Sequence, residues 1–208
     1  MTFKRLGKIS SASVLAGLLA LAGIAHSQEK LNNDYFAPDR DNSALATVER
    51  YHLAPGTDFW KMFRAREYHY AIQDMYFVLR YFPNHPKALT LLGSLARLMK
   101  QPSLPISHFQ KAITLFPQHA ITHAQFGNYL AAIDQVDPAI EQLKEAVQLD
   151  PKLAVAYGWL AEAYAKKGEA ELAREAAEQA RQLGYRKPAS VPEQQTEALE
   201  KREDAKPK

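Results

Sequence analysis

Apolar residues recur every three or four positions through most of the chain between residues 43 and 183, and turn-forming residues interrupt them at short intervals. Such spacing places the apolar side chains on one face of an α-helix. The pattern predicts a short helix over residues 43–53, ended by Pro55 and Gly56, and then four pairs of helices. The predicted pairs are 57–65 with 67–82, 86–99 with 103–116, 120–133 with 136–149, and 153–166 with 169–183. The sequence therefore predicts an all-α protein.

The helix pairs form an internal repeat. Pro83, Pro117 and Pro151 lie 34 residues apart, and Tyr185 continues the series. A period of about 34 residues is typical of helix-turn-helix units that stack, each burying its apolar face against the next. A stacked array has no obvious reaction centre, but it offers a long surface that can hold another chain.

Other prolines support the predicted helix boundaries. A proline inside a helix costs about 3 kcal/mol, whereas the first turn tolerates it because the missing N–H has no helical partner there. Pro86 therefore predicts a helix start. Asp137–Pro138 predicts an N-cap followed by a first-turn proline, and Ser103 with Pro105 resembles that arrangement.

The repeats resemble tetratricopeptide repeats, which place large apolar, small and proline residues at fixed offsets. The matching residues of three units are Leu89, Leu92, Gly93, Ala96, Phe109, Ala112 and Pro117; His123, Phe126, Gly127, Leu130, Ala139, Leu143, Ala146 and Pro151; and Tyr157, Leu160, Ala161, Tyr164, Gly168, Ala173, Ala177 and Ala180. The first unit keeps only its second half, because Pro55 and Asp58 stand where large apolar residues belong. The resemblance implies a right-handed solenoid of antiparallel helix pairs, with about three good repeats and one degenerate capping unit.

Small residues at fixed offsets indicate where helices come close together. We expect Gly93, Gly127 and Ala161 to let the two helices of a pair approach, with large side chains filling the remaining space to interior density. Leucine at position 127 would then overpack the third pair.

The resemblance also implies a concave groove lined by the first helix of each pair. The corresponding ligand-facing residues of this chain are Lys87, Thr90, Ser94, Arg97, Gln125, Asn128, Glu162 and Lys166. Asn128 is the foremost candidate, because family members often use an Asn at that offset to bind a ligand backbone or carboxylate. The two-carboxylate clamp of chaperone-binding members is not reproduced, because Ala124, Ala131 and Gly158 occupy some of its places.

The first residues predict export. Lys4, Arg5 and Lys8 precede an apolar run over residues 12–25, and Ala25 with Ser27 suits a signal peptidase, so we expect cleavage after Ser27. A retained membrane anchor is the alternative, although the run is shorter than the roughly 20 residues that span a bilayer. Without its leader the chain loses three cations from a formal charge of +3, and no basic footprint of a nucleic-acid binder remains.

Composition and motifs exclude several chemistries. The chain has no cysteine, which rules out disulfides, thiol catalysis and an N-terminal lipid anchor on cysteine. It contains no phosphate-binding loop, nucleophile elbow or metalloprotease helix motif, so we expect neither an enzyme nor a cofactor. His119 and His123 have the spacing of paired metal ligands, but His123 fills a packing offset, and we expect no metal site.

The segment from Tyr68 to Phe82 is more aromatic than one buried helix face requires. We expect Trp60, Phe63 and residues 43–53 to cover the excess, as a capping unit would. The alternative is an exposed aromatic patch that forms a second binding surface or a homodimer contact through the degenerate first repeat.

These observations predict four segments and an interaction scaffold. The segments are a signal peptide (1–27), a linker with a short capping helix (28–56), the repeat array (57–185, in units 57–85, 86–119, 120–153 and 154–185) and a charged flexible tail (186–208). We expect a bacterial periplasmic protein that binds a protein or peptide partner and supports assembly of a cell-envelope complex. The alternative is an accessory subunit of a polysaccharide or cell-wall machine that contacts glycan or an enzyme.

Overall fold

The structure is a computed structural model of the chain, and it describes residues 32–186. The predicted signal peptide and the predicted tail beyond Arg186 lie outside these residues. Within them the chain is helical and contains no strand, which confirms the all-α prediction. No helix among them has the length and hydropathy needed to cross a membrane.

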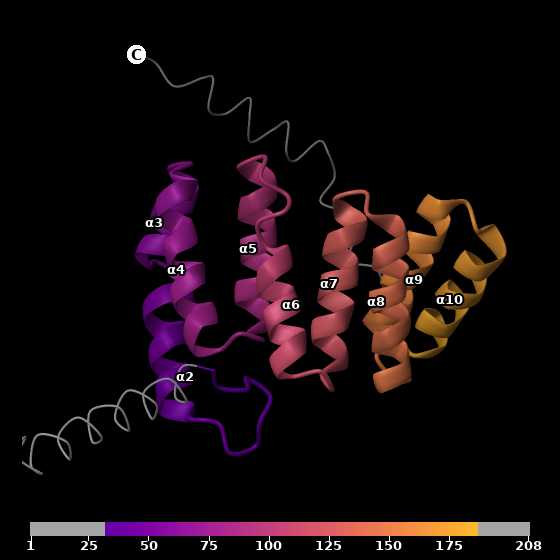
Figure 1. The fold of residues 1–208 in the computed structure, drawn as a ribbon, viewed down its shortest axis with the longest axis horizontal. Helices are drawn as coiled ribbons and strands as arrows, with labels where there is room; N and C mark the ends of the chain where they lie inside the picture. The colour runs from indigo at the N-terminus through magenta and orange to yellow at the C-terminus, as the bar shows by residue number, and fades with distance from the viewer. Residues whose placement is uncertain (1–31, 187–208) are drawn as a thin grey trace, which may run out of the picture.

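The helices follow one another closely along the chain (Figure 1). They are α2 (Asn42–Val48), the π-helical turn η1 (Glu49–Leu53), α3 (Asp58–Arg64), α4 (Tyr68–Tyr81), α5 (Pro86–Leu98), α6 (Ile106–Leu115), α7 (Ala120–Ala132), α8 (Val136–Leu149), α9 (Ala154–Lys167) and α10 (Ala170–Gln182). Short turns join α5 to α6, α7 to α8 and α9 to α10, so that successive helices run antiparallel (Figure 1).

The helix pairs stack side by side into a solenoid. Each second helix packs on the first helix of the next pair, as α4 does on α5 and α8 on α9. The first helices α5, α7 and α9 also contact one another in succession, so they form one continuous face of the array. This arrangement confirms the predicted solenoid of antiparallel helix pairs.

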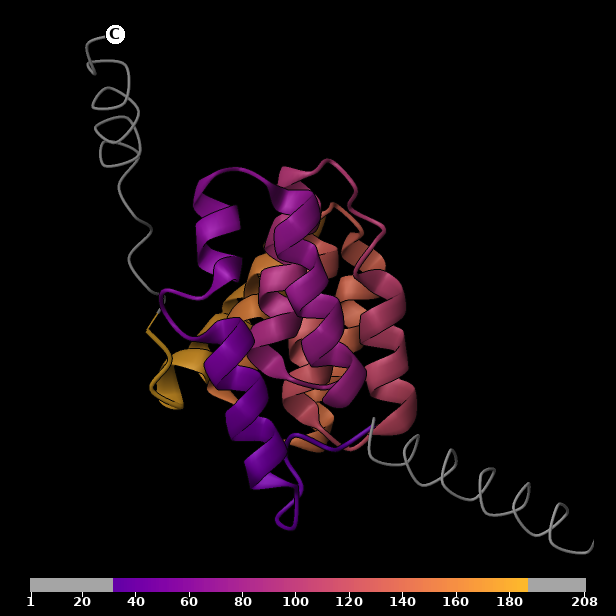
Figure 2. The same ribbon diagram turned by 90° about the vertical axis from the view of Figure 1, so that its left-hand side faces the viewer.

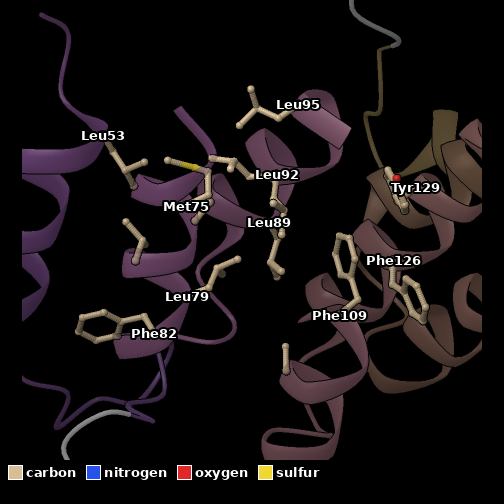
Figure 3. Close-up of a cluster of buried hydrophobic side chains, with 14 of the residues drawn as sticks. Leu53, Met75, Leu79, Phe82, Leu89, Leu92, Leu95, Phe109, Phe126 and Tyr129 are labelled. Carbon is tan, nitrogen blue, oxygen red and sulfur yellow. The ribbon is translucent and has the colours of Figure 1, made fainter. Parts of the chain in front are cut away.

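The interior consists of two apolar clusters. The first runs from α2 to α8 and contains Leu53, Met75, Leu89 and Phe109, which Figure 3 shows. The second joins α7, α8, α9 and α10, with Leu143 and four alanines fully buried. Because each pair contributes to the burial of its neighbour, the stack is stabilised by contacts between adjacent units.

In the first unit, two separate segments, α2 with η1 and then α3, take the place of the single first helix of the other pairs. Gly56 adopts φ +87° next to Pro55, and this turn separates α2 and η1 from α3. The Trp60 indole N–H donates to the carbonyl of Leu53 at 3.2 Å and ties the two segments together across the break. Both segments lie along α4, η1 against one part and α3 against another (Figure 2).

The aromatic excess of residues 68–82 is only partly covered. Met75 and Phe82 are fully buried, and Trp60 and Phe63 pack on the same cluster, as expected of a capping unit. However, Phe77 stays 42% exposed, and Tyr70 69% exposed. Both sequence interpretations therefore hold in part, because residues 42–53 cover one side of α4 and leave another open.

An extended strap, residues 33–36, binds the edge of the array. It crosses two turns with related sequences, Phe82-Pro83-Asn84-His85 and Phe116-Pro117-Gln118-His119. The Tyr35 ring lies 4.7 Å from the His85 ring, and the Phe36 ring 4.8 Å from the His119 ring. The Tyr35 amide donates to Asn84 Oδ1 at 2.9 Å, and Asp34 Oδ2 lies 2.8 Å from His119 Nε2. The 34-residue repeat thus gives each strap ring its own histidine.

Three local predictions need correction. Helix α8 begins at Val136 with Gln135 as its N-cap, so Asp137 lies inside the first turn and caps nothing. Pro105 itself is the N-cap of α6, and Ser103 makes no capping bond. By contrast, Pro86 does start α5.

The prediction that Gly93 lets the two helices of its own pair approach each other is also wrong. A Cβ at Gly93 would lie 2.8 Å from Cδ2 of Tyr129, which belongs to the next unit, and not against α6. Helices α5 and α6 approach each other less closely than the helices of the third and fourth pairs. The Tyr129 side chain fills the space, and its hydroxyl donates to the carbonyl of Pro102 at 2.6 Å.

Candidate functional site

The predicted groove residues lie on α5, α7 and α9, the helices that form the continuous face. We call this surface the first-helix face. On it, the Gln125 side-chain amide donates to Thr90 Oγ1 at 3.1 Å and to the carbonyl of Pro86 at 3.0 Å. Thr90 and Gln125 therefore join successive repeats, and some of their hydrogen-bonding atoms are occupied by bonds within the protein.

Three predicted residues meet in one hollow between α7 and α9. Asn128, Glu162 and Lys166 line a depression of about 120 Å³ together with Trp159, Ala131 and Ala132. The Lys166 ammonium donates to the carbonyl of Ala131 at 2.7 Å and lies 3.0 Å from Asp134 Oδ1. These bonds hold the cation at the wall of the hollow, across the boundary between two repeats.

Lys87 lies in a second, larger hollow at the N-terminal end of the face. This hollow measures about 470 Å³ and is lined by Ala46, Glu49, Arg50, Leu53, Ala54 and Lys87. The Lys87 ammonium donates to the carbonyl of Leu53 at 3.0 Å, which fixes α5 against η1. The π-helical turn η1 thus extends the first-helix face beyond α5.

Ser94 and Arg97 lie apart from these hollows. Both are exposed on α5, and the Ser94 hydroxyl donates back to the carbonyl of Thr90 at 3.1 Å. Burial raises the pKa of the neighbouring Tyr129, and the positive charge of Arg97 opposes that rise. Among residues 32–186, no hydrogen bond or ion pair engages the Arg97 guanidinium or the Asn128 side chain.

Sequence reasoning missed Arg50, Glu49 and Trp159. Glu49 and Arg50 belong to the segment that the sequence predicted as a capping helix. The break at Pro55 and Gly56 separates this segment from the repeats, so the sequence did not indicate that it takes the place of a first helix. Trp159 directly precedes Leu160, which matches the repeat pattern, and it lies between the groove offsets. A helical wheel of α9 would have placed it beside Glu162, three residues further on.

Family comparison decides the identity of this architecture. Residues 127–168 match a TPR repeat model, and residues 154–183 match a tetratricopeptide repeat model. The chain contains tetratricopeptide repeats. Proteins of this family are protein–protein interaction scaffolds and are generally non-catalytic. No curated protein sequence matches the chain.

Several solved tetratricopeptide structures are similar. A crystal structure of MamA is 27% identical, with a TM-score of 0.48 over 61% of this chain and 74% of that one. MamA from Desulfovibrio magneticus RS-1 is 22% identical, with a TM-score of 0.48 over 60% and 71% of the two chains. YrrB, described as a TPR protein with an unusual peptide-binding site, is 25% identical, with a TM-score of 0.47 over 59% and 63%.

The C-terminal end of the tetratricopeptide array is covered by its own chain. The Tyr185 ring lies directly over Gly158, where any Cβ would meet it. Gly158, Ala161, Ala177 and Tyr185 line a hollow of about 300 Å³ there. Gly158, whose offset is that of a ligand contact, is therefore used to seat Tyr185.

His85 is the most deeply buried titratable side chain on the edge of the array that the strap binds, at 1% exposed. Its Nδ1 accepts a hydrogen bond from the Ala88 amide at 3.3 Å and caps α5, so the proton of the neutral ring lies on Nε2. Nε2 lies 3.2 Å from Glu49 Oε1, but the two are not aligned as a hydrogen bond. Burial lowers the pKa of His85, and the Glu49 charge only partly opposes this effect.

The two histidines with metal-ligand spacing serve separate purposes in the tetratricopeptide fold. His119 Nε2 lies 2.8 Å from Asp34 Oδ2 in the strap. His123 is buried, with Nδ1 2.9 Å from Gln142 Oε1 and Nε2 3.0 Å from the carbonyl of Pro117. No group of three or more His, Cys, Asp or Glu side chains suited to a metal ion occurs in the part of the chain that the structure describes.

Proposed function

We propose that the first-helix face binds an extended segment or a helix of a protein partner, and that the chain acts by this binding and not by catalysis. The observation that carries the proposal is the hollow formed by Asn128, Trp159, Glu162 and Lys166 between successive repeats. It combines an amide, an acid and a cation beside an aromatic ring and small apolar residues. Peptide-binding grooves typically use such a mixture of polar groups for orientation and apolar area for affinity.

The two ends of the face suit different parts of a partner. Arg50 and Lys87 at the N-terminal hollow present two cations against the single carboxylate of Glu49. An acidic side chain or chain terminus of the partner fits there, because charge-assisted hydrogen bonds to Arg and Lys are the stronger ones. The hollow at Asn128 takes the following backbone, whose carbonyl and amide groups match a side-chain amide.

We further propose that this binding takes place in the bacterial periplasm and supports assembly of a cell-envelope complex. The basic start at Lys4, Arg5 and Lys8, the apolar run over residues 12–25 and the small residues near Ser27 support export. The complete lack of cysteine agrees with a fold that does not depend on disulfides after export.

A glycan is the second candidate ligand, and Trp159 favours it. An aromatic ring beside the Glu162 carboxylate and the Asn128 amide in one hollow offers a stacking surface together with hydroxyl-binding groups. In that case the protein would be an accessory subunit of a polysaccharide or cell-wall machine.

The test is capture of partners from envelope extract by the full-length protein and by an Asn128→Ala, Arg97→Ala double variant. Neither side chain bonds to another described residue, so their removal should leave the fold intact. The control is Gln110→Ala, Lys111→Ala, which removes a similar amide and cation from two exposed positions of α6.

A protein captured by the wild type and the control but lost by the double variant supports the proposal. Equal capture by all three contradicts it. Binding of purified cell-wall glycan that depends on Trp159, with no protein captured, would favour the second candidate.

A further inference from the structure

The part of the chain that the structure describes ends beside the first-helix face. A left-handed turn at Gly184 (φ +81°) follows α10, and the Tyr185 amide donates to the carbonyl of Ala180 at 2.8 Å. Such a turn is typical of helix C-termini, and it folds the chain back onto α9, where the Tyr185 ring meets Gly158. Residues 187–208 therefore begin at α9, next to the groove proposed above.

The hollow at Tyr185 adjoins the hollow that carries the proposed function, because Glu162 lines both of them. The walls of the hollow at Tyr185 are otherwise small and apolar, with alanines of α9 and α10, apart from Arg181. The Arg181 guanidinium is already bound to both side-chain oxygens of Glu178. Among residues 32–186 no further unit follows α10, so this apolar hollow lies open at the end of the array (Figure 1).

The sequence after Arg186 has an apolar part and then an acidic part. Residues 188–192 are two prolines, a valine, an alanine and a serine, and residues 193–200 contain three glutamates. No lysine or arginine occurs among residues 188–200, whereas Lys201 and Arg202 follow directly. We call residues 188–200 the tail segment. Its apolar part suits the apolar hollow at Tyr185, and its acids suit a surface that carries cations.

Two cations on the first-helix face are available to the acids of the tail segment. Arg97 is exposed on α5, and the Lys166 side chain stays 46% exposed beside its contact with Asp134. Asp134 offsets part of the Lys166 charge, which makes Arg97 the stronger of the two attractions. The two cations lie on the first helices before and after α7. Packed helices are about 8–10 Å apart, so Arg97 and Lys166 are roughly 16–20 Å from each other.

The tail segment is long enough to reach both cations. A chain extends by at most about 3.3–3.6 Å per residue, so the stretch from Arg186 to Glu193 can cover up to about 25 Å. Lys166 lies about 12 Å along α9 from the point where the chain returns to that helix. The next stretch, from Glu193 to Glu200, has the same length and can bridge the spacing between Lys166 and Arg97.

We infer that the tail segment binds the first-helix face of its own chain, with residues 188–192 over the hollow at Tyr185 and the three glutamates along Lys166 and Arg97. This assignment rests on the proposed function, because it gives the same groove an occupant from within the chain. A tethered segment has an effective concentration of the order of millimolar at a site within its reach, so weak contacts suffice to hold it. A partner must displace the tail segment before it can bind.

Paramagnetic broadening of NMR signals in the full-length protein tests the inference. The chain has no cysteine, so Thr196→Cys provides a single site for a nitroxide label in the tail segment. We expect the label to broaden the amide signals of Ser94 and Arg97 on α5 more strongly than those of Lys144 and Glu145, which are exposed on α8. Helix α8 is nearer to α9 and α10 along the array, so a label that does not bind the face would broaden α8 at least as much as α5.

Charge variants of the labelled protein test the role of the acids. Glu193→Gln, Glu197→Gln, Glu200→Gln should lose the broadening on α5, because the attraction to Arg97 and Lys166 is removed. Glu203→Gln, Asp204→Asn removes acids just beyond the tail segment and is the matched control, which should keep the broadening. Both variants leave residues 32–186 unchanged, so neither alters the fold of the array.

A mixture of isotope-labelled protein without nitroxide and nitroxide-labelled protein without isotope shows whether the contact lies within one chain, in which case its signals stay sharp. Broadening in this mixture, broadening of α8 equal to that of α5, broadening that persists in the triple glutamine variant, or its loss in the control would each overturn the inference. The measurement contains no partner, so these outcomes leave the proposed function standing, whereas equal capture of partners from envelope extract would contradict the proposed function alone.

Discussion

Gly127 and Leu143 are so close that no side chain fits between them: a Cβ at position 127 would lie 2.6 Å from Cγ of Leu143. The same Cβ would lie 2.9 Å from the carbonyl oxygen of Ala139. The backbone of α7 at Gly127 therefore packs directly against the Leu143 side chain of α8, which is the close approach that the sequence predicted for this pair.

Replacing Gly127 by leucine should strongly destabilise the protein. Overpacking a filled interior typically costs about 1–3 kcal/mol, and the nearby backbone oxygen of Ala139 cannot rotate away as a side chain would. The measurement is the midpoint of chemical denaturation. A midpoint equal to that of the wild type would mean that α7 and α8 are not packed as described.

Alanine at the two helical glycines of α5 and α7 should destabilise the protein to different extents. Alanine gains about 1 kcal/mol over glycine inside a helix. At Gly93 the new methyl group meets ring atoms of the buried Tyr129, whose hydroxyl is bonded to the carbonyl of Pro102, so the ring must move and we expect a small net loss. At Gly127 it meets Leu143 and a backbone oxygen that cannot rotate away, so we expect a larger loss. Equal effects in thermal melts would contradict this difference.

The strap should depend on Asn84 and not on its counterpart one repeat later. Asn84 is fully buried, accepts from the Tyr35 amide and donates to Asp34 at 2.6 Å. Asn84→Ala leaves the Tyr35 amide without its acceptor and removes one of the hydrogen bonds to Asp34, which should cost about 1–3 kcal/mol. Hydrogen exchange at the Tyr35 amide should accelerate as well. Gln118→Ala, at the equivalent exposed turn position, is the control and should change neither quantity.

Stability should fall as the pH drops below about 6.5, with His85 contributing to the loss. Burial holds the pKa of this imidazole below its ordinary value of 6.5, so the unfolded chain binds a proton in a range where the folded chain does not. Protons therefore favour unfolding as the pH falls through this window, whereas above it His85 is neutral in both states.

Comparison of variants isolates the contribution of His85. His85→Asn keeps a side-chain cap for α5 and removes the titration, so its free energy of unfolding should depend less on pH between 7.5 and 5 than that of the wild type. His69→Asn changes an exposed histidine and should leave the pH dependence unaltered. A His85→Asn profile parallel to the wild type would contradict the assignment.

Asp34 should make stability depend on pH in a second, more acidic range. Its partial burial raises the pKa, but hydrogen bonds from Asn84, His119 and the Phe36 amide outweigh burial and hold the pKa below 3.8. The stabilisation is therefore present above pH 3.8 and is lost as the pH falls through the lowered value.

The sequence predicted the helices well because their signals are local. Pro86 starts α5 where expected, and Gly168 ends α9 in the left-handed conformation at φ +85°. The predictions for Ser103 and Asp137 were wrong because capping depends on how the preceding turn is bent, which short-range pattern does not specify. In the same way, the sequence placed Gly93 against its own pair, since nothing local reveals that Tyr129 of the next unit fills that space.

The candidate site was predictable only in outline. Asn128, Glu162 and Lys166 could be placed together because the repeat period brings equivalent offsets side by side. Arg50 could not, because it belongs to a segment whose sequence follows no repeat pattern and becomes part of the face only through contacts such as that of Lys87 with Leu53. The strap was missed for the same reason, since its contacts join residues about 50 to 85 positions apart.

The strap also determines where mechanical load enters the molecule. Tension applied to the chain before Asn33 would first meet the bond from the Asn33 amide to the carbonyl of Tyr81 and then those that join Asp34 and Tyr35 to Asn84. These groups lie at the turn between α4 and α5, so the pull would be carried to the junction of the first two units before it reaches α2. The first unit would then be shielded from force, and its outer aromatic surface would keep its shape while the protein is tethered from its N-terminal side.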